Sequence, residues 1–194
     1  MKSVTGELNM DKTKNPIAEQ SKQWITQSFL MLLEKKRIEE ITISEISKKA
    51  QLSRRTFYRN FNSKTDVIIT YCEHICDEYI KFLDKDIQYT RNHIIEVYFL
   101  FWEQHIDFLR LLSNNELLCH LIEVSNRYWG EIYSRFKTHW NDESSDIELE
   151  YCLLFNMGGL WNILIKWIYD EHRNKPKDLE KLIQHSLNNF IKSI

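Results

Sequence analysis

The segment Thr42–Phe61, TISEISKKAQLSRRTFYRNF, decides the fold that we predict for this chain of 194 residues. Thr42 and Glu45 have the spacing of a capping box, which predicts the start of one short helix. Ser53 is a suitable N-cap residue and predicts the start of a second short helix, residues 54–60. Two such helices joined by a short turn are typical of a helix-turn-helix.

The apolar residues of this segment lie where a helix-turn-helix needs them. Ile43 and Ile46 face inward from the first helix, and Ala50 is small where two helices approach closely. Leu52 fills the turn, and Phe57 anchors the second helix. The rest of the second helix is cationic or hydrogen-bonding, as a recognition helix requires for contact with phosphates and base edges.

Charge is unevenly distributed along the chain. The net charge of the whole sequence is −2, which by itself suggests no polyanionic partner. Residues 1–66 contain 13 Lys and Arg and 8 Asp and Glu, whereas residues 67–194 contain 13 and 20. The resulting charges of +5 and −7 favour nucleic-acid contact at the basic end, with a solvated basic face as the alternative.

Composition and periodicity favour an all-α protein. The chain has only 4 Gly and 2 Pro, whereas these residues make up roughly 12% of an average protein, so a turn-rich β structure is disfavoured. Apolar residues at helical spacing predict further helices at residues 16–32, 63–83, 98–112, 118–136, 145–171 and 176–191. We expect a disordered tail (residues 1–14), a three-helix DNA-binding domain (15–66) and, joined to it by a long helix, a second helical domain (67–194).

The sequence gives no sign of a membrane span, a cofactor site or an active site. No apolar run approaches the ~18 residues of a spanning helix, and the N-terminus lacks a signal-peptide pattern, so we expect a cytoplasmic protein. No nucleophile–base set and no phosphate loop occurs, which disfavours an enzyme. Cys72 and Cys76 share one face of a predicted helix, with His74 nearly opposite, which disfavours a metal site. Two buried thiols are the main interpretation of these cysteines, and redox or metal sensing is the alternative.

The helix-turn-helix resembles that of the TetR family of transcriptional regulators. The likeness is carried by Thr42–Ile46, Ala50–Ser53, and the T-F-Y-x-x-F-x-x-K order of Thr56–Lys64. It covers about residues 18–78, and Gly158-Gly159, Trp167 and Lys175-Pro176 are similar to the end of a TetR regulatory domain. The resemblance thus implies a regulatory and dimerisation role for the second domain (67–194). The family usually has Gly in the turn where this chain has Gln51, and a left-handed conformation there would cost roughly 1–2 kcal/mol.

The resemblance implies DNA contacts on both sides of the turn. Lys64 and Tyr58 are similar to phosphate-contacting residues of the family, and Thr42 and Ser53 to hydroxyls that cap helices and touch phosphate. Base reading is expected from the recognition helix, because Arg suits guanine and Asn suits adenine. The predicted DNA-binding residues are Thr42, Ser53, Arg54, Arg55, Thr56, Tyr58, Arg59, Asn60 and Lys64. The alternative for the arginines is a solvated helix face.

A single recognition helix reads few base pairs, so we expect a homodimer on a palindromic double-stranded DNA operator. The resemblance places the dimer surface on the last two long helices, where Gly158-Gly159 allows close backbone approach; a merely buried helix is the alternative. The predicted interface residues are Leu154, Gly158, Gly159, Trp161, Ile165, Leu187 and Phe190.

The regulatory half is rich in aromatic residues, which are suited to a flat or lipophilic small-molecule effector. The candidate pocket residues are Tyr98, Trp102, His105, Trp129, Tyr133 and Phe155. Ordinary core filling is the alternative for each of them. The sequence thus predicts a ligand-responsive repressor, with a TetR-like protein-interaction module or activator that works through a partner regulator as the alternative.

Overall fold

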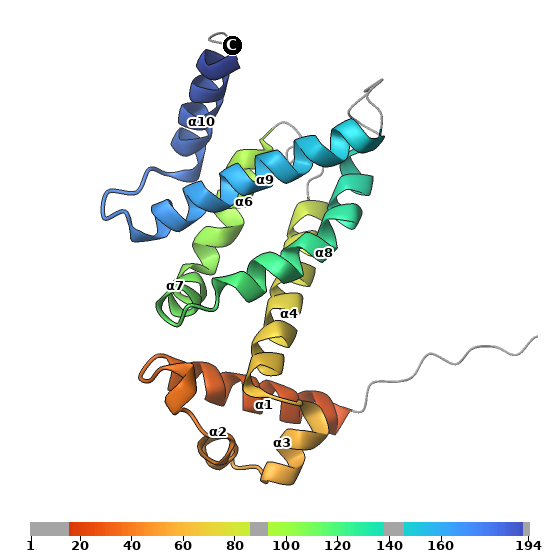
Figure 1. Ribbon diagram of the computed structural model, residues 1–194, viewed down its shortest axis with the longest axis vertical. Helices are drawn as coiled ribbons and strands as arrows, with labels where there is room; N and C mark the ends of the chain where they lie inside the picture. Colours follow the sequence, from red (N-terminus) through yellow and green to blue (C-terminus); the bar gives the residue numbers. More distant parts are fainter. Residues whose placement is uncertain (1–15, 86–92, 138–145, 192–194) are drawn as a thin grey trace, which may run out of the picture. The chain divides into compact units, whose positions relative to one another are not determined.

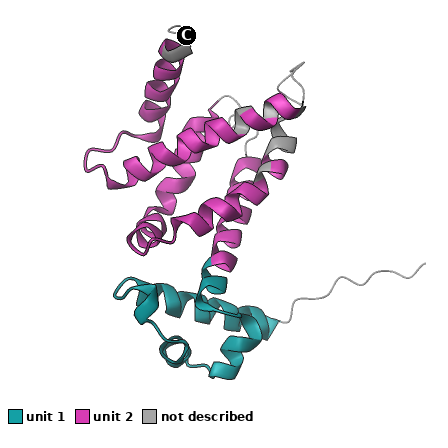
Figure 2. Cartoon of the chain, viewed as in Figure 1, with its two compact units in different colours: residues 1–68 teal, residues 69–194 magenta. Residues whose placement is uncertain are grey.

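The computed structural model of the protein describes residues 16–85, 93–137 and 146–191. The chain forms two compact units, residues 1–68 and 69–194 (Figure 2). Every regular element in the described ranges is a helix, which confirms the all-α fold class (Figure 1). The predicted tail, residues 1–14, lies outside the described residues.

The first unit contains the helix-turn-helix. Its elements are α1 (Pro16–Leu33), a 3₁₀ turn (Ile38–Glu40), α2 (Ile43–Lys49), α3 (Arg54–Asn60) and the first residues of α4 (Lys64–Asp84). α1 packs on both α2 and α3. The fully buried side chains include Phe29 of α1, Ile46 of α2 and Phe57 of α3. These three residues join the helices into one core, so α3 is held by its buried face and its other face is left exposed.

The turn between α2 and α3 contains one residue in the left-handed conformation. Gln51 has a φ of 56°, in the left-handed region that favours glycine. The amide of Gln51 donates to the Lys48 carbonyl, and the amide of Leu52 donates to the Ser47 carbonyl. Together these bonds form a Schellman motif that ends α2 and satisfies its last carbonyls.

A Gln51→Gly variant should therefore be more stable than the wild type. Removing the Cβ relieves roughly 1–2 kcal/mol of left-handed strain, and the extra backbone entropy of glycine offsets roughly 0.5–1 kcal/mol of that gain. The net increase in unfolding free energy should be about 0.5–1 kcal/mol, measured by urea denaturation of the full chain. Gln51→Ala is the matched control and should bring no gain, because alanine keeps the Cβ. An equal gain in both variants would contradict backbone strain as the cause.

The second unit contains the rest of α4 and five further helices of the described chain. These are α6 (Ile94–Gln104), α7 (Ile106–Asn114), α8 (Leu118–Lys137), α9 (Asp146–Tyr169) and α10 (Pro176–Ile191). Within this unit α10 packs on α6, and α7 contacts α8 and α9. No helix of the described ranges is long and apolar enough to cross a membrane.

The single helix predicted for residues 98–112 is wrong, because the chain breaks at His105. This residue has φ −113° and ψ 19°, ends α6 and precedes α7. Its imidazole packs on Phe101, with ring centroids 4.5 Å apart, and its amide donates to the Trp102 carbonyl. Apolar periodicity continues across the break, so the sequence pattern does not reveal it.

Candidate nucleic-acid interface

The start of α2 is fixed by the predicted capping box. The Thr42 hydroxyl accepts from the Glu45 amide at 3.2 Å, and the Glu45 carboxylate accepts from the Thr42 amide at 2.9 Å. The Lys36 ammonium also donates to Glu45, at 2.7 Å. This bond and those from Thr42 lower the pKa of Glu45 to about 2. The Thr42 hydroxyl is thus already engaged in the cap, at an exposed position where the sequence predicts a phosphate contact.

The start of α3 is capped by Ser53, also as predicted. The Ser53 hydroxyl accepts from the Thr56 amide at 3.0 Å and lies 2.9 Å from the Thr56 hydroxyl. Asn60, in the last turn, donates from its side-chain amide to the Thr56 carbonyl at 2.7 Å. The oxygen of the Asn60 side chain has no such bond among the described residues, so the predicted reading of adenine would require the amide group to leave Thr56.

The exposed face of α3 is cationic. Arg54, Arg55 and Arg59 are all exposed and form no ion pair with any residue in the described ranges. Tyr58 is 50% exposed beside them, and its ring packs edge-on against Phe57, which is fully buried. Two aromatic residues that are adjacent in the sequence therefore lie on opposite faces of α3: Phe57 is in the core, and Tyr58 is on the surface with the arginines.

Lys64 has a structural role that the sequence does not indicate. Its ammonium donates to the carbonyls of Ile38 and Ile41, the latter at 2.7 Å. These bonds join the first residue of α4 to the 3₁₀ turn that precedes α2. One ammonium proton remains for a phosphate, because a lysine has three donors. Replacing Lys64 would therefore disturb the unit as well as remove a candidate DNA contact.

These features define the class of the protein. A short helix with an exposed cationic face, joined by a tight turn to a second short helix and anchored by one buried aromatic residue, is a DNA-binding helix-turn-helix. The start of α4, which follows the helix-turn-helix, is capped by Ser63, whose hydroxyl accepts from the Asp66 amide at 3.0 Å.

Comparison with known proteins shows which family the helix-turn-helix segment resembles. Residues 27–70 match the model of the family described as bacterial regulatory proteins, tetR family. An uncharacterized HTH-type transcriptional regulator, YxbF of Bacillus subtilis, is 24% identical over 156 residues, or 77% of this chain. The match spans 39% of the length of that relative. The helix-turn-helix segment of this chain is thus similar to the DNA-binding region of the tetR family of bacterial regulatory proteins.

The fold is similar to that of a solved regulator. The fatty acid degradation regulator FadR from Bacillus halodurans superimposes with a TM-score of 0.59 and 18% sequence identity. The superposition covers 90% of this chain and 95% of that protein. The likeness supports the two-part, all-α layout.

The second unit encloses a small apolar cavity of about 20 Å³. It is lined by residues of α4, α6, α8 and α9: Cys76, Tyr79, Tyr98, Trp102, Ser125, Tyr128, Ile132, Met157 and Trp161. The Tyr98 hydroxyl and the indole nitrogens of Trp102 and Trp161 are buried without a hydrogen-bond partner among the described residues. Burial raises the pKa of Tyr98 well above its usual value, so its hydroxyl stays protonated. The cavity surface is thus almost entirely apolar, and the three donors lie on residues that line it rather than on the surface itself.

The predicted pocket residues fall in different places. Tyr98 and Trp102 line the cavity, whereas His105 is half-buried beside Glu78, with 4.0 Å between Nε2 and the carboxylate. Phe155 is 72% exposed and does not line the cavity, which corrects its predicted placement. The side chains of Trp129 and Tyr133 lie outside the described residues.

The predicted dimer residues also divide between two faces of α9. Leu154 is 50% exposed, and Gly158 and Gly159 are exposed as well. Trp161 is only 6% exposed and lines the cavity, which corrects its predicted place on the surface. Ile165 is half-buried. On α10, Leu187 is 39% exposed, and the side chain of Phe190 lies outside the described residues.

The burial of Trp161 and the exposure of Phe155 follow from their positions around the helix. Trp161 follows Met157 by four residues, so the two share the buried face of α9. Phe155 precedes Met157 by two residues and therefore points away from that face. Because α9 is apolar on more than one side, its periodicity does not tell which side is buried.

Cys72 and Cys76 lie on the buried side of α4. Burial raises the pKa of the Cys72 thiol to about 12 and that of the Cys76 thiol to about 11. The Cys76 sulfur lies 3.6 Å from the Ser125 hydroxyl. Cys119 of α8 is exposed. These surroundings favour the interpretation of Cys72 and Cys76 as inert thiols.

In the native protein at pH 7.5, iodoacetamide should therefore modify Cys119 and leave Cys72 and Cys76 unmodified. A pKa of about 11 makes the thiolate fraction roughly 300-fold smaller than at the ordinary pKa of about 8.5. Mass spectrometry of the peptides with and without denaturant measures the difference. Modification of Cys72 or Cys76 at the rate of Cys119 would contradict the burial and restore the sensing interpretation.

Proposed function

We propose that this chain is a homodimeric repressor that binds a palindromic operator through α3 and is released by a small-molecule effector. The observation that carries the proposal is the face of α3, where Arg54, Arg55 and Arg59 are exposed and have no ion-pair partner in the described part of the chain. Guanidinium groups of this kind bind phosphates and the O6 and N7 atoms of guanine. Their concentration in the basic segment of a protein with a net charge of −2 favours a nucleic-acid role for this helix.

A binding selection of the full chain on random double-stranded DNA tests the proposal. We expect an inverted repeat whose half-sites are centred about one helical turn apart or a multiple of it. Enrichment of a single half-site would contradict binding as a dimer. Failure to enrich any sequence at low salt would contradict sequence-specific binding and leave the protein-interaction module as the function.

The exposed face of α9 supports dimerisation. Ile147, Tyr151, Leu154 and Phe155 are between 50% and 72% exposed, and Gly158 continues their stripe at helical spacing. A Cβ added at Gly158 would meet nothing within 4 Å in the described part of the chain. A glycine destabilises a helix by roughly 1 kcal/mol relative to alanine. No close contact within the described residues of one subunit requires a glycine at this position and so explains that cost. A second copy seated on this face would use the close approach and would bury the apolar stripe.

The cavity supports an effector that acts by opening the second unit. Its volume of about 20 Å³ is far below the roughly 300 Å³ or more of a usual ligand pocket. An effector must therefore expand the cavity, and a hydrogen-bond acceptor on it would satisfy the unpaired donors of Tyr98, Trp102 and Trp161. An apolar body with one polar acceptor is the ligand chemistry that fits this wall.

Expansion of the cavity would act on α4. This helix contributes Cys76 and Tyr79 to the cavity wall, and its first residue, Lys64, is bonded to the carbonyls of Ile38 and Ile41 beside the helix-turn-helix. A ligand that favours the expanded state would shift the helix and lower DNA affinity, as a two-state coupling requires. Thermal-shift measurements with and without operator DNA identify such ligands, because DNA must weaken their binding by the same factor.

A further inference from the structure

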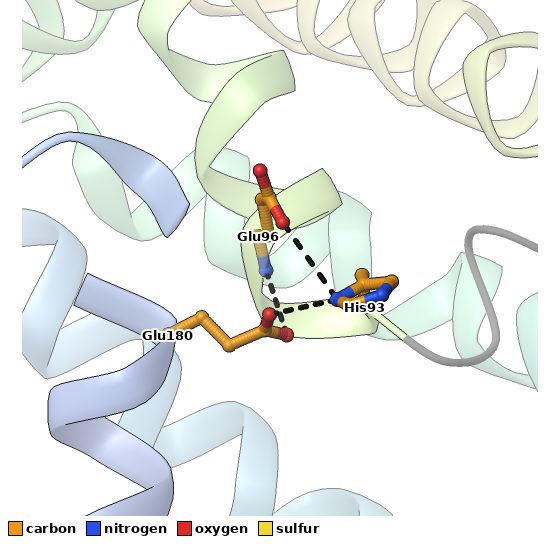
Figure 3. Close-up of side chains that lie close together, drawn as sticks. All are labelled: His93, Glu96 and Glu180. Carbon is orange, nitrogen blue, oxygen red and sulfur yellow. Dashed lines mark hydrogen bonds and ion pairs between the residues drawn. The ribbon is translucent and has the colours of Figure 1, made fainter. Parts of the chain in front are cut away.

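A cluster of three potential metal ligands lies at the start of α6, away from the cavity lining. His93 precedes α6, Glu96 lies in its first turn, and Glu180 reaches it from α10 (Figure 3). The His93 Nδ1 atom is 3.0 Å from Glu180 Oε2 and 3.7 Å from Glu96 Oε2. The ligand atoms of all three residues lie within 4.8 Å of one another.

The two carboxylates are buried and have no lysine or arginine beside them among the described residues. The side chain of Glu180 is 6% exposed and that of Glu96 is 11% exposed. In the described ranges neither carboxylate pairs with a lysine or an arginine, and the ionisable partner of both is His93. Buried charges in proteins are normally paired or coordinate a metal ion, because the low dielectric strengthens the repulsion between like charges.

The Glu96 carboxylate is the less satisfied of the two. Glu180 accepts from the backbone amide of Glu96 at 3.4 Å and is close to the His93 ring. The Glu96 carboxylate accepts no hydrogen bond from the described residues, and its polar neighbour is the His93 nitrogen at 3.7 Å. Glu96 as a whole is 8% exposed, so water does not readily replace the missing donor. A buried carboxylate that accepts no hydrogen bond from the described residues thus points toward His93 in the cluster (Figure 3).

The spacing of these atoms fits a metal ion. Bonds of about 2.0–2.2 Å in tetrahedral geometry place ligand atoms roughly 3.4 Å apart. The observed separations of 3.0 and 3.7 Å bracket this value, so small side-chain rotations suffice to bring three atoms onto one ion. His93 is 43% exposed on its side chain, which leaves room for water as a further ligand.

We propose that His93, Glu96 and Glu180 bind one divalent transition-metal ion per chain. The imidazole ligand favours zinc and manganese over magnesium and calcium, which prefer all-oxygen sites. The ion neutralises the two buried carboxylates and joins the start of α6 to α10. This site lies outside the proposed DNA-binding and effector functions and does not depend on them.

Isothermal titration of the chelator-treated full chain with MnCl₂ and ZnCl₂ tests the site. We expect one ion per chain, tighter binding of zinc than of manganese, and at least about 10-fold weaker binding of magnesium. Manganese is included because it avoids thiolates and so reports on this cluster separately from exposed Cys119. Metal at about 100 times its Kd should raise the Tm by about 5 °C.

Three single variants, His93→Asn, Glu96→Gln and Glu180→Gln, should each weaken manganese binding at least about 100-fold. Glu78→Gln is the matched control, because Glu78 also lies near two histidines, His74 at 3.6 Å and His105 at 4.0 Å. It should bind manganese as the wild type does. Far-UV circular dichroism checks that each variant is folded, and His93→Asn carries the test if a buried substitution unfolds the chain, since His93 is the more exposed ligand.

The absence of saturable manganese and zinc binding by the wild type at millimolar concentration would overturn the proposal. Unchanged affinity in the folded variants of the cluster would overturn it as well. Loss of binding in Glu78→Gln with retention in Glu180→Gln would place the site at the other histidines and would likewise overturn it.

Discussion

A Phe155→Asp variant should be monomeric and should bind operator DNA at least about 100-fold more weakly than the wild type. Phe155 is 72% exposed in one chain, so the substitution leaves the fold of a single subunit intact. If the stripe on α9 is the dimer surface, twofold symmetry buries two unpaired carboxylates, each at a cost of several kcal/mol. The DNA affinity falls because two recognition helices must act together on one operator.

Sedimentation equilibrium and operator titration measure the two effects, and thermal denaturation checks the fold. Met31→Asp is the matched control, because Met31 is also 50% exposed but belongs to α1 and is not part of the α9 stripe. This variant should remain dimeric. A dimeric Phe155→Asp protein with normal operator affinity would show that the α9 stripe is not the dimer surface.

An Arg55→Ala variant should lose about 30-fold or more in operator affinity while retaining most of its affinity for unrelated DNA. A bidentate arginine–guanine contact discriminates between bases by about 1–3 kcal/mol, and a symmetric dimer loses two such contacts. Arg55 is exposed and has no ion-pair partner in the described ranges, so its removal should not destabilise the unit. Base preference at one position of each half-site should relax.

Titrations of operator and unrelated DNA at several salt concentrations separate loss of base reading from loss of charge. Lys35→Ala is the matched control, since it removes the same charge from an exposed residue after α1, outside the motif. It should change neither the preferred sequence nor the ratio of specific to nonspecific affinity. An Arg55→Ala protein with wild-type operator affinity and preference would exclude Arg55 as a base-reading residue.

Replacing Lys64 would change the structure of the first unit as well as remove a candidate DNA contact. From the resemblance alone, Lys64→Ala would only weaken phosphate binding. The Lys64 ammonium also donates to the carbonyls of Ile38 and Ile41 beside the 3₁₀ turn, so the same variant removes two hydrogen bonds that hold this turn to the start of α4. Arg55 and Arg59 carry no such structural bonds in the described ranges and give a cleaner test of the DNA contact.

The sequence by itself determined the helix-turn-helix. The caps at Thr42 and Ser53, the left-handed Gln51 and the buried Phe57 each depend on residues within one or two helical turns. Local hydrogen bonds and steric limits therefore specify them, and a short stretch of sequence contains all the partners. The all-α class followed in the same way from periodicity and from the scarcity of Gly and Pro.

The tertiary structure decided which faces and which distant residues meet. It placed Trp161 at the cavity and Phe155 on the surface, a distinction that periodicity does not make in a helix that is apolar on several sides. His93 and Glu96 have the spacing of neighbours on a helix, but Glu180 is 87 residues from His93 and comes close only because α10 packs on α6. Such encounters depend on the packing of whole helices, which no local pattern encodes.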